Sequence, residues 1–466
     1  MRPPIPALGT PRASTGPLWC IIALTLGCAS PVSSSEGVIL ISLDTLRADH
    51  LGVYGGSNGL TPNLDRFAAE SVVFDQTYAA ANETLYSHAA LFTGQAPSRL
   101  SSLSRHFAIP TEAPTLAGVL TAAGWDTAGF VAGGHLSRYF GLNAGFSTWD
   151  DASAWGSLHD TGPKALAWLD ARDSKNGRPF FIFVHGYDTH DRYLKPTPFG
   201  YAFTAPEPDV GQSLGSLIAR TAGAAGHVID GVYSPSIDDE ALLGLEHPRF
   251  DRGRGIRTLD PDAKPLSPAD IVQLNAVYDG SVAWADACFG LFMAGLDARG
   301  LLDRVTVIVL SDHGEELGEA GVFQHRYSLD DATTHVPLMV RLPGGAHGGR
   351  RLTGLTSLVD VAPAILDLQG YQGLGDAGHP VRDAILGRDY PGRSSVISEG
   401  ALHLLSARGP HARLTLEGVS AENPLAASLL AAIPVDGVSL RAEGDPEEIP
   451  ALRRDLVAFR TPGGPR

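Results

Sequence analysis

The chain has 466 residues, of which 44% are hydrophobic and 18% are charged. This composition excludes a disordered chain and a membrane protein with many spans, and the length allows a sizeable core. The 51 acidic residues outnumber the 35 basic ones, so the formal net charge of −16 argues against general binding to the nucleic-acid backbone. Only three residues are cysteine and only four are lysine, and both scarcities restrict the chemistry open to the protein.

The N-terminus has the pattern of an export signal. Residues 1–17 include arginine but no acidic residue, and residues 18–27 (LWCIIALTLG) form an apolar run that is too short to span a bilayer. The run ends at Cys28 in the sequence LTLGC, which resembles a lipoprotein signal whose cysteine becomes lipidated. We therefore expect a signal peptide over residues 1–27, a tether over 28–36, and an exported protein held in the cell envelope or periplasm by lipidated Cys28. An ordinary cleaved signal peptide is the alternative.

The body of the chain alternates apolar strand patterns with helix-length segments. This alternation predicts a mostly parallel sheet covered by helices on both faces, a three-layer αβα sandwich. We predict strands over 38–43, 126–132, 179–185, 305–311 and 337–342. We predict helices over 63–70, 85–93, 114–123, 163–172, 268–298 and 358–368.

Three further segments complete the predicted domain organisation. Residues 37–390 form the main α/β domain, and within it residues 200–267, rich in Gly, Pro and Asp, are interpreted as an insertion over one edge of the sheet. Residues 391–466 contain short strand patterns and a predicted helix over 446–459, which indicate a small C-terminal subdomain.

Polar residues stand at the ends of three predicted strands. Asp44 follows the first strand, Asp312 and His313 follow the strand over 305–311, and the sequence HGYDTH at 185–190 ends another. Ligands of open α/β sheets bind beyond the carboxyl ends of the strands, and two carboxylates with an imidazole can hold a divalent cation. For each residue alone, a role in a turn or a helix cap is the simpler interpretation.

Thr84 falls at the predicted start of the helix over 85–93. A helix N-terminus offers free N–H groups and a positive dipole end, which favour a sulfate or phosphate group. His88 lies one turn further on and is expected to share that direction. The alternative for Thr84 is a plain N-cap.

Several longer motifs follow one another between residues 37 and 370: ILISLDTLRADHLGVYG, TPNLDRFAAESVVFDQTYAA, ETLYSHAALFTG, HGYDTHDRY, VYDGSVAWADACFGLFMAGLDARGLL, VIVLSDHGEELGEAG, THVPLMVRLPG and TSLVDVAPAILDLQGY. In this order they resemble the sulfatase family of the alkaline phosphatase superfamily. The resemblance implies an ester hydrolase with one divalent metal held by Asp44, Asp312 and His313. It also implies that His190 faces the ester and that His325 protonates a leaving oxygen.

The metal ligands depart from the common sulfatase pattern at two positions. Thr45 stands where many sulfatases have a second Asp, and His313 stands where many have Asn. Imidazole suits transition metals better than it suits calcium, so Mn or Zn is favoured and Ca is the third possibility.

The segment that holds the nucleophile differs even more from the common sulfatase pattern. Sulfatases convert a Cys or Ser in a C-x-P-x-R motif to formylglycine, and here Thr84, Tyr86 and His88 take the places of the Cys, Pro and Arg. Threonine cannot form formylglycine, so no formylglycine is expected. None of the four lysines lies in an active-site motif, and Ala320 replaces a common His. Neutralisation of the substrate then depends on the metal, on His88, His190 and His325, and on Arg47 or Arg326.

These observations predict a hydrolase of sulfate, phosphate or phosphonate esters with Thr84 as nucleophile. Thr is a nucleophile beside a metal in other branches of the superfamily, and a Thr-phosphate ester is easier to turn over than a Thr-sulfate ester. A phosphoryl head-group transferase is an alternative, although such transferases generally carry multi-span segments and this chain has no apolar run of about 18 residues. The second alternative is a non-catalytic binding protein on a decayed sulfatase scaffold.

Overall fold

The computed structural model describes most of the chain after residue 34. The described residues are 35–56, 59–100, 108–153, 155–172, 177–190, 193, 195–196, 198–199, 202–203, 268–319, 323–326, 328–374, 381–400, 404–417 and 439–460. The predicted signal peptide, Cys28, Ala320 and nearly all of the predicted insertion over 200–267 lie outside them.

An eight-stranded sheet forms the centre of the protein, with the strand order β11-β2-β10-β7-β1-β6-β4-β5. Strand β10 pairs antiparallel with both of its neighbours, and every other pairing in this sheet is parallel, which confirms the predicted mostly parallel sheet. In chain order the strands are β1 (Gly37–Leu43), β2 (Val72–Phe74), β4 (Asp126–Phe130), β5 (Thr148–Asp150), β6 (Phe180–Gly186), β7 (Val305–Leu310), β10 (Leu338–Arg341) and β11 (Arg350–Leu352).

The central strands are apolar throughout because both faces of the sheet are covered. All seven residues of β1 are buried, and successive residues enter opposite cores: Val38 and Leu40 pack in one cluster, whereas Ile39 and Ile41 pack in the other. This alternation follows from the two-residue period of a strand. A run such as VILISL is therefore the expected sequence of a strand buried on both sides.

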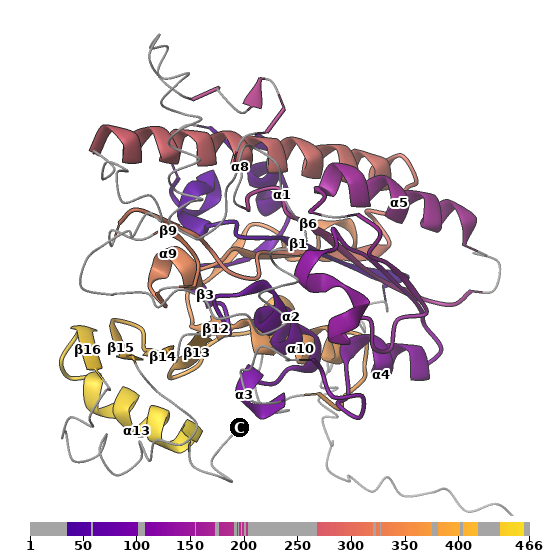
Figure 1. Ribbon diagram of the computed structural model, residues 1–466. Coiled ribbons are helices and arrows are strands. Elements are labelled where there is room, and N and C mark those ends of the chain that lie inside the picture. Colours follow the sequence, from indigo (N-terminus) through magenta and orange to yellow (C-terminus); the bar gives the residue numbers. More distant parts are fainter. Residues whose placement is uncertain are drawn as a thin grey trace, which may run out of the picture. The chain divides into compact units, whose positions relative to one another are not determined.

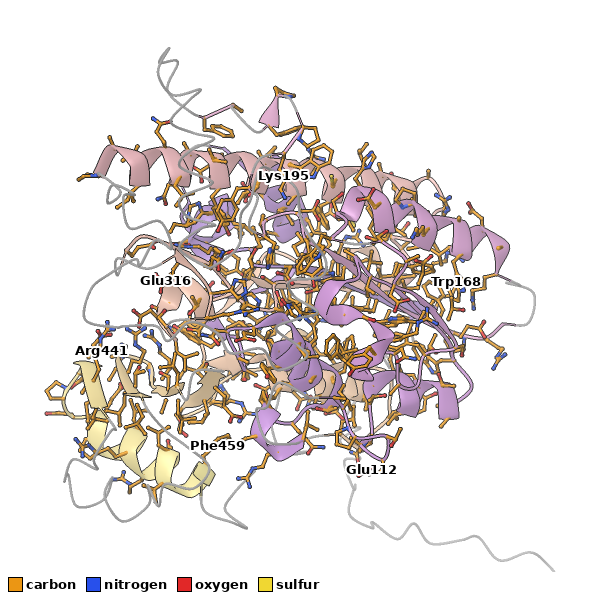
Figure 2. The ribbon with its side chains drawn as sticks, viewed as in Figure 1. Glu112, Trp168, Lys195, Glu316, Arg441 and Phe459 are labelled. Carbon is orange, nitrogen blue, oxygen red and sulfur yellow. The ribbon has the colours of Figure 1, made fainter. Side chains whose placement is uncertain are left out.

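Helices form the outer two layers (Figure 1). One layer contributes to the core cluster of Ile39 and consists of α1 (Pro62–Ala69), α5 (Leu158–Ala171) and α8 (Pro268–Asp297). The other contributes to the cluster of Val38 and includes α2 (Thr84–Thr93), α4 (Leu116–Ala122) and α10 (Val361–Leu368). Figure 2 shows side chains filling the space between these layers and the sheet. The three-layer αβα prediction is confirmed. Among the described residues, no helix has both the length and the apolar character needed to cross a membrane.

Helix α5 begins five residues before its predicted start at 163. Ser157 and Asp160 form a capping box at its N-terminus, in which the Ser157 backbone N–H donates to Asp160 Oδ2 at 2.7 Å. The N–H of Leu158 donates to Asp188 Oδ2 at 2.8 Å. The prediction missed this start because Pro163 lies inside the helix, where proline is uncommon.

The C-terminal part forms a four-stranded antiparallel sheet with one helix, as the predicted small subdomain requires. Its elements are β13 (Val396–Gly400), β14 (Leu404–Arg408), β15 (Ala412–Glu417), β16 (Ser439–Gly444) and α13 (Ile449–Arg460). Strand β13 is joined to the segment before α2, because Glu399 N donates to Ala80 O at 2.9 Å and Ser398 Oγ donates to Ala79 O at 2.7 Å. The C-terminal sheet therefore adjoins the segment that leads to Thr84.

Candidate active site

The predicted metal ligands meet at the carboxyl ends of two adjacent strands. Asp44 directly follows β1, and Asp312 and His313 follow its parallel neighbour β7. All three side chains are fully buried, and one ligand atom from each lies within 4.8 Å of the others. Strand pairing thus brings together residues that are far apart in the sequence.

The two carboxylates form an electrostatic environment that suits a cation. Among the described residues, neither Asp44 Oδ1 nor Asp312 Oδ2 has a hydrogen-bond partner. Burial, and then the neighbouring Asp44 carboxylate, raise the pKa of Asp312 well above its usual range. Burial alone would also raise the pKa of Asp44, but the hydrogen bond from His185 and the nearby histidines outweigh burial and hold it low. Two adjacent buried carboxylates with unsatisfied oxygens fit a divalent cation.

His313 is oriented to act as a ligand. Its Nδ1 donates to the carbonyl oxygen of Gly314 at 2.9 Å, which leaves the lone pair on Nε2. Burial lowers the pKa of His313 to about 4, so the ring is neutral near pH 7. The Thr84 hydroxyl donates to Nε2 at 3.3 Å. The candidate nucleophile therefore directly contacts the candidate metal ligand.

Thr84 is the first residue of α2 and is 2% exposed. The residue before it, Glu83, occupies the N-cap position in an extended conformation but makes no side-chain capping hydrogen bond. Ser87 fixes the helix to the segment that carries Asp312, because its hydroxyl donates to the Asp312 carbonyl at 2.7 Å. The uncapped N–H groups and the dipole of α2 thus surround the Thr84 hydroxyl, a suitable environment for an anionic group.

His88 supports the first turn of α2. Its Nδ1 donates to the Thr84 carbonyl at 2.8 Å, and the Ser42 hydroxyl donates to its Nε2 at 3.0 Å. The ring is fully buried, and burial lowers its pKa to about 3. A neutral ring with both nitrogens engaged orients Thr84 and supplies no positive charge.

His325 and His190 extend a row of imidazole rings from His313. The centroid of the His325 ring lies 4.4 Å from that of His313 and 5.2 Å from that of His190. His325 Nδ1 donates to Glu315 Oε1 at 3.0 Å, and the Glu315 side chain is fully buried. This hydrogen bond fixes the His325 ring and leaves Nε2 for another partner. His190 also packs against Trp155, with centroids 5.4 Å apart.

The sequence prediction assigned no role to His185, Glu315, Thr189 or Ser42. His185 is the next-to-last residue of β6, and its Nε2 donates to Asp44 Oδ2 at 3.1 Å. The Thr189 hydroxyl donates to the Asp44 carbonyl. His185 belongs to a predicted strand end, and Glu315 belongs to the DHGE motif. The partners of both side chains come from other segments of the chain. Their sequence positions indicate that such residues lie near the candidate site, but they do not indicate which residues they contact.

The two arginines considered for charge neutralisation differ in their surroundings. Arg47 is buried and already engaged: Nη1 donates to the Glu315 carbonyl at 3.0 Å, and the guanidinium pairs with Asp49 at 2.7 Å. The Arg326 side chain is 38% exposed, and its Nε lies 3.9 Å from Glu83 Oε1. Arg47 therefore joins the segment after Asp44 to the segment after His313, and Arg326 lies beside the start of α2.

Comparison with known proteins decides the family. The sulfatase family model matches residues 37–371, which is most of the chain. The chain belongs to the sulfatase family. One relative of this sulfatase-family chain is an ulvan-active sulfatase of Formosa agariphila, 25% identical over 76% of this chain and 67% of the relative. Another is PehA of Trinickia caryophylli, a multifunctional alkaline phosphatase superfamily protein, 28% identical over 44% of this chain and 37% of PehA. The match with PehA thus spans less than half of either protein.

Solved structures of the same fold include phosphonate monoester hydrolases. The enzyme of Agrobacterium radiobacter has a TM-score of 0.62 and 19% identity, with coverage of 91% of this chain and 93% of that chain. The enzyme of Silicibacter pomeroyi has a TM-score of 0.61 and 18% identity, with coverage of 90% and 93%. At these identities the likeness shows the αβα fold of this sulfatase-family chain. Family membership and these relatives support an ester hydrolase.

Proposed function

We propose that this chain is a metal-dependent hydrolase of sulfate, phosphate or phosphonate esters in which Thr84 is the nucleophile. One observation carries the proposal: the Thr84 hydroxyl lies 3.3 Å from His313 Nε2, at the N-terminus of α2 and beside two buried carboxylates with unsatisfied oxygens. A nucleophile, an anion-favouring helix end and a cation site are therefore found together.

Each residue then has a defined task. Asp44, Asp312 and His313 hold the divalent cation, Mn, Zn or Ca. When bound, such a cation lowers the pKa of a nearby hydroxyl and stabilises charge on the ester oxygens. Thr84 Oγ attacks sulfur or phosphorus, expels the alcohol and forms a Thr ester, which water cleaves.

Five further side chains orient the reacting groups. His88 and Ser42 hold the first turn of α2 in place. His325, held by Glu315 at Nδ1, accepts the Thr84 proton at its unprotonated Nε2 and then passes it to the leaving oxygen. His190 stands beside His325 on the substrate side.

The chemistry of threonine favours phosphorus over sulfur. A hydrated formylglycine expels sulfate from its geminal diol, whereas a Thr-sulfate ester has no such route. We therefore expect phosphodiester or phosphonate ester substrates to be turned over faster than aryl sulfates.

The test uses purified protein loaded with Mn, Zn or Ca and a panel of aryl sulfate, phosphate monoester, phosphodiester and phosphonate ester substrates. Thr84→Ala is expected to lower kcat about a thousandfold or more, whereas Thr84→Ser keeps a hydroxyl and retains measurable turnover. Asp312→Asn is expected to weaken metal binding, measured by calorimetry. Undiminished turnover by Thr84→Ala would refute the nucleophile, and unchanged metal affinity in Asp312→Asn would refute the metal site.

We also propose that the protein is exported and anchored through a lipid on Cys28. The apolar run over 18–27 and the sequence LTLGC support this. In cell fractionation, the wild-type chain is expected in the detergent-soluble membrane fraction and Cys28→Ala outside it. Equal distribution of the two chains would instead support an ordinary cleaved signal peptide.

A further inference from the structure

A row of rings leads away from the candidate cation site to the segments that follow β5 and β6. The His313 ring contacts that of His325, which in turn contacts that of His190. The row continues with Trp155, whose ring centroid lies 5.4 Å from that of His190. Trp155 follows β5 and His190 follows β6, and both strands run parallel to β4. Both rings therefore lie beyond the carboxyl ends of the strands, where open α/β sheets bind ligands.

Tyr187 supports the end of this row. Its side chain is 4% exposed, and its ring centroid lies 4.7 Å from that of Trp155 and 5.2 Å from that of His190. The Tyr187 hydroxyl donates to the Gly133 carbonyl at 3.4 Å and accepts the N–H of His135 at 3.2 Å. A buried and hydrogen-bonded tyrosine thus holds the other two rings, whereas Trp155 itself is only half-buried.

The backbone at Trp155 is strained and firmly held. Trp155 has a φ of 57°, in the left-handed region that bulky residues rarely adopt. The next residue, Gly156, is fixed on both sides: its N–H donates to the Ala132 carbonyl at 3.2 Å, and its carbonyl accepts the N–H of Tyr187 at 2.9 Å. Strained conformations of this kind persist where the surrounding contacts fix them, and they are concentrated at functional sites. The strain draws attention to the indole as a functional group.

The acidic side chains that precede Trp155 are paired with basic ones. Asp151 pairs with Arg138 at 2.5 Å, and Asp150 pairs with Lys164 at 2.9 Å. A half-buried indole beside paired charges offers a ligand an apolar π surface rather than a net charge. Such a surface suits a ring-shaped group, either an aromatic ring or the apolar face of a sugar.

We propose that Trp155 forms a subsite for the alcohol part of the ester, and that the preferred alcohols carry a ring that packs against its indole. The inference rests on the proposed ester hydrolase function and adds a substrate class to it. The His190 ring contacts both the indole and the ring of His325, which serves the leaving oxygen. Only one imidazole therefore separates the place of the leaving oxygen from the subsite. Aryl and sugar alcohols share this chemistry, and the test distinguishes them.

Binding to a chain that lacks the nucleophile gives the direct test. Thr84→Ala supplied with Mn is titrated by calorimetry with phenyl phosphate, glucose 6-phosphate and methyl phosphate, which differ only in the alcohol. Trp155→Gly, added to this chain, removes the indole and suits the positive φ. It should weaken the binding of one or both ring esters by about 5- to 50-fold, and that of methyl phosphate by no more than about twofold.

Two further variants control for a general structural effect. Trp155→Phe keeps a ring at the same position and should retain most of the affinity for the ring ester that responds. Trp168→Ala is the matched control, because Trp168 is also half-buried but contacts Phe180, at the opposite end of β6 from His190 (Figure 2). It should leave all three affinities within about twofold of the parent.

The outcomes separate this inference from the proposed function. Equal losses for all three esters in Trp155→Gly, or no loss, would overturn the subsite, and so would the absence of measurable binding of both ring esters to the parent. A loss confined to phenyl phosphate supports an aryl alcohol, and a loss confined to glucose 6-phosphate supports a sugar. If Thr84→Ala hydrolyses phenyl phosphate as fast as the wild-type chain does, the proposed function fails whatever Trp155 binds.

The affinity for Mn shows whether the variant is intact. If Trp155→Gly no longer binds Mn, Trp155→Leu takes its place, because leucine keeps an apolar side chain but has no π surface. The same order of losses is expected, with the ring esters weakened more than methyl phosphate, and equal affinities in Trp155→Leu and its parent would overturn the subsite.

Discussion

At the scale of single residues, Asp188 combines a structural role with a marked electrostatic cost. Its side chain is fully buried, and its Oδ2 accepts the N–H of Leu158 at the start of α5. Burial raises the pKa of Asp188 from 3.8 to about 6. The carboxylate is thus ionised at neutral pH in a place that disfavours its charge.

This cost predicts a stability that falls as pH rises. Because the pKa of Asp188 is higher in the folded state than in the unfolded state, the unfolded chain releases this proton first between about pH 4 and pH 6. Asp188→Asn keeps an acceptor for Leu158 and has no charge to bury. Its free energy of unfolding should therefore gain about 2 to 3 kcal/mol relative to wild type between pH 4 and pH 7, measured by urea denaturation. Parallel pH profiles for the two chains would contradict the prediction.

The proximity of the candidate ligands could be predicted because strand ends are visible in sequence. Asp44 and Asp312 each follow an apolar run, and parallel strands place such residues on one edge. The supporting residues could not be predicted. Glu315 holds His325 and Ser42 holds His88 only after the chain has folded. Thr45 is a further case, since it adopts a positive φ of 59° and its N–H donates to Asp312 Oδ1 at 3.3 Å.

At the scale of elements, α8 supplies the N-terminal cap that α1 lacks in its own sequence. Thr61 occupies the N-cap position of α1, but its side chain makes no capping hydrogen bond. Asp286 of α8 takes its place: its Oδ1 accepts the N–H of Asn63 at 3.0 Å and that of Leu64 at 2.7 Å. A carboxylate from a neighbouring helix therefore satisfies the free N–H groups of the first turn.

Removal of this carboxylate should destabilise the protein through α1. Asp286 is 2% exposed, so Asp286→Ala leaves two N–H groups without acceptors and should lower the free energy of unfolding by about 2 kcal/mol. Asp286→Asn keeps one acceptor oxygen, so its free energy of unfolding should fall by less. The control is Asp297→Ala, at an exposed position at the end of the same helix. It should change the free energy of unfolding by about 0.5 kcal/mol or less. Equal losses for Asp286→Ala and Asp297→Ala, by urea denaturation, would refute the cap.

Long elements were predicted more accurately than short ones. The start of α8 is as predicted and its end differs by one residue, and β1 differs by one residue, because a buried helix and a doubly buried strand leave strong apolar patterns. The short strands β2 and β11 have three residues each and were missed. β2 pairs with β10 and with β11. Because these partners lie far from β2 in the sequence, no local pattern signals the pairing.

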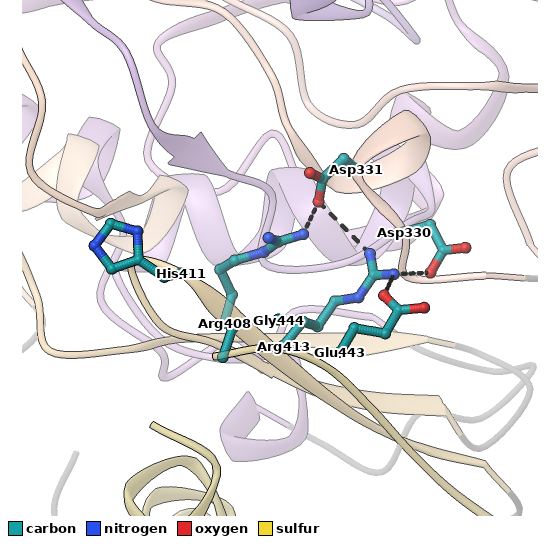
Figure 3. Close-up of a pocket in the computed structure, with 8 residues that line it drawn as sticks. Asp330, Asp331, Arg408, His411, Arg413, Glu443 and Gly444 are labelled. Carbon is teal, nitrogen blue, oxygen red and sulfur yellow. Dashed lines mark hydrogen bonds and ion pairs between the residues drawn. The ribbon is translucent and has the colours of Figure 1, made fainter. Parts of the chain in front are cut away.

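At the scale of the whole molecule, ion pairs join the C-terminal sheet to the start of the short helix α9 (Asp331–Thr334), which follows His325 in the chain. Arg413 of β15 pairs with Asp330 at 2.8 Å and also with Glu443 of β16, and Arg408 of β14 pairs with Asp331 (Figure 3). These residues line a small cleft of about 250 Å³. No predicted site residue lines this cleft, so its charges serve attachment of the sheet rather than the proposed chemistry.

The attachment predicts unequal effects of two neighbouring arginines. The Arg413 side chain is 9% exposed, whereas that of Arg441, which also pairs with Glu443, is 51% exposed. Arg413→Met leaves Asp330 and Glu443 without this partner and should lower the free energy of unfolding by about 2 kcal/mol, with faster hydrogen exchange in residues 328–335. Arg441→Met should change it by less than about 1 kcal/mol, because exposed ion pairs contribute little. Equal effects of the two substitutions would contradict this attachment.

The pairing of β1 with β7 also governs when the protein becomes active. Thr45 and Asp312 contact each other across 267 residues of sequence, so no short fragment of the chain contains the complete cation site. Contacts of such separation form late, because the intervening chain must first be closed into a loop. In a newly made chain the candidate metal ligands are therefore scattered, and its chemistry begins when folding nears completion. Synthesis of the polypeptide thus proceeds without premature ester cleavage.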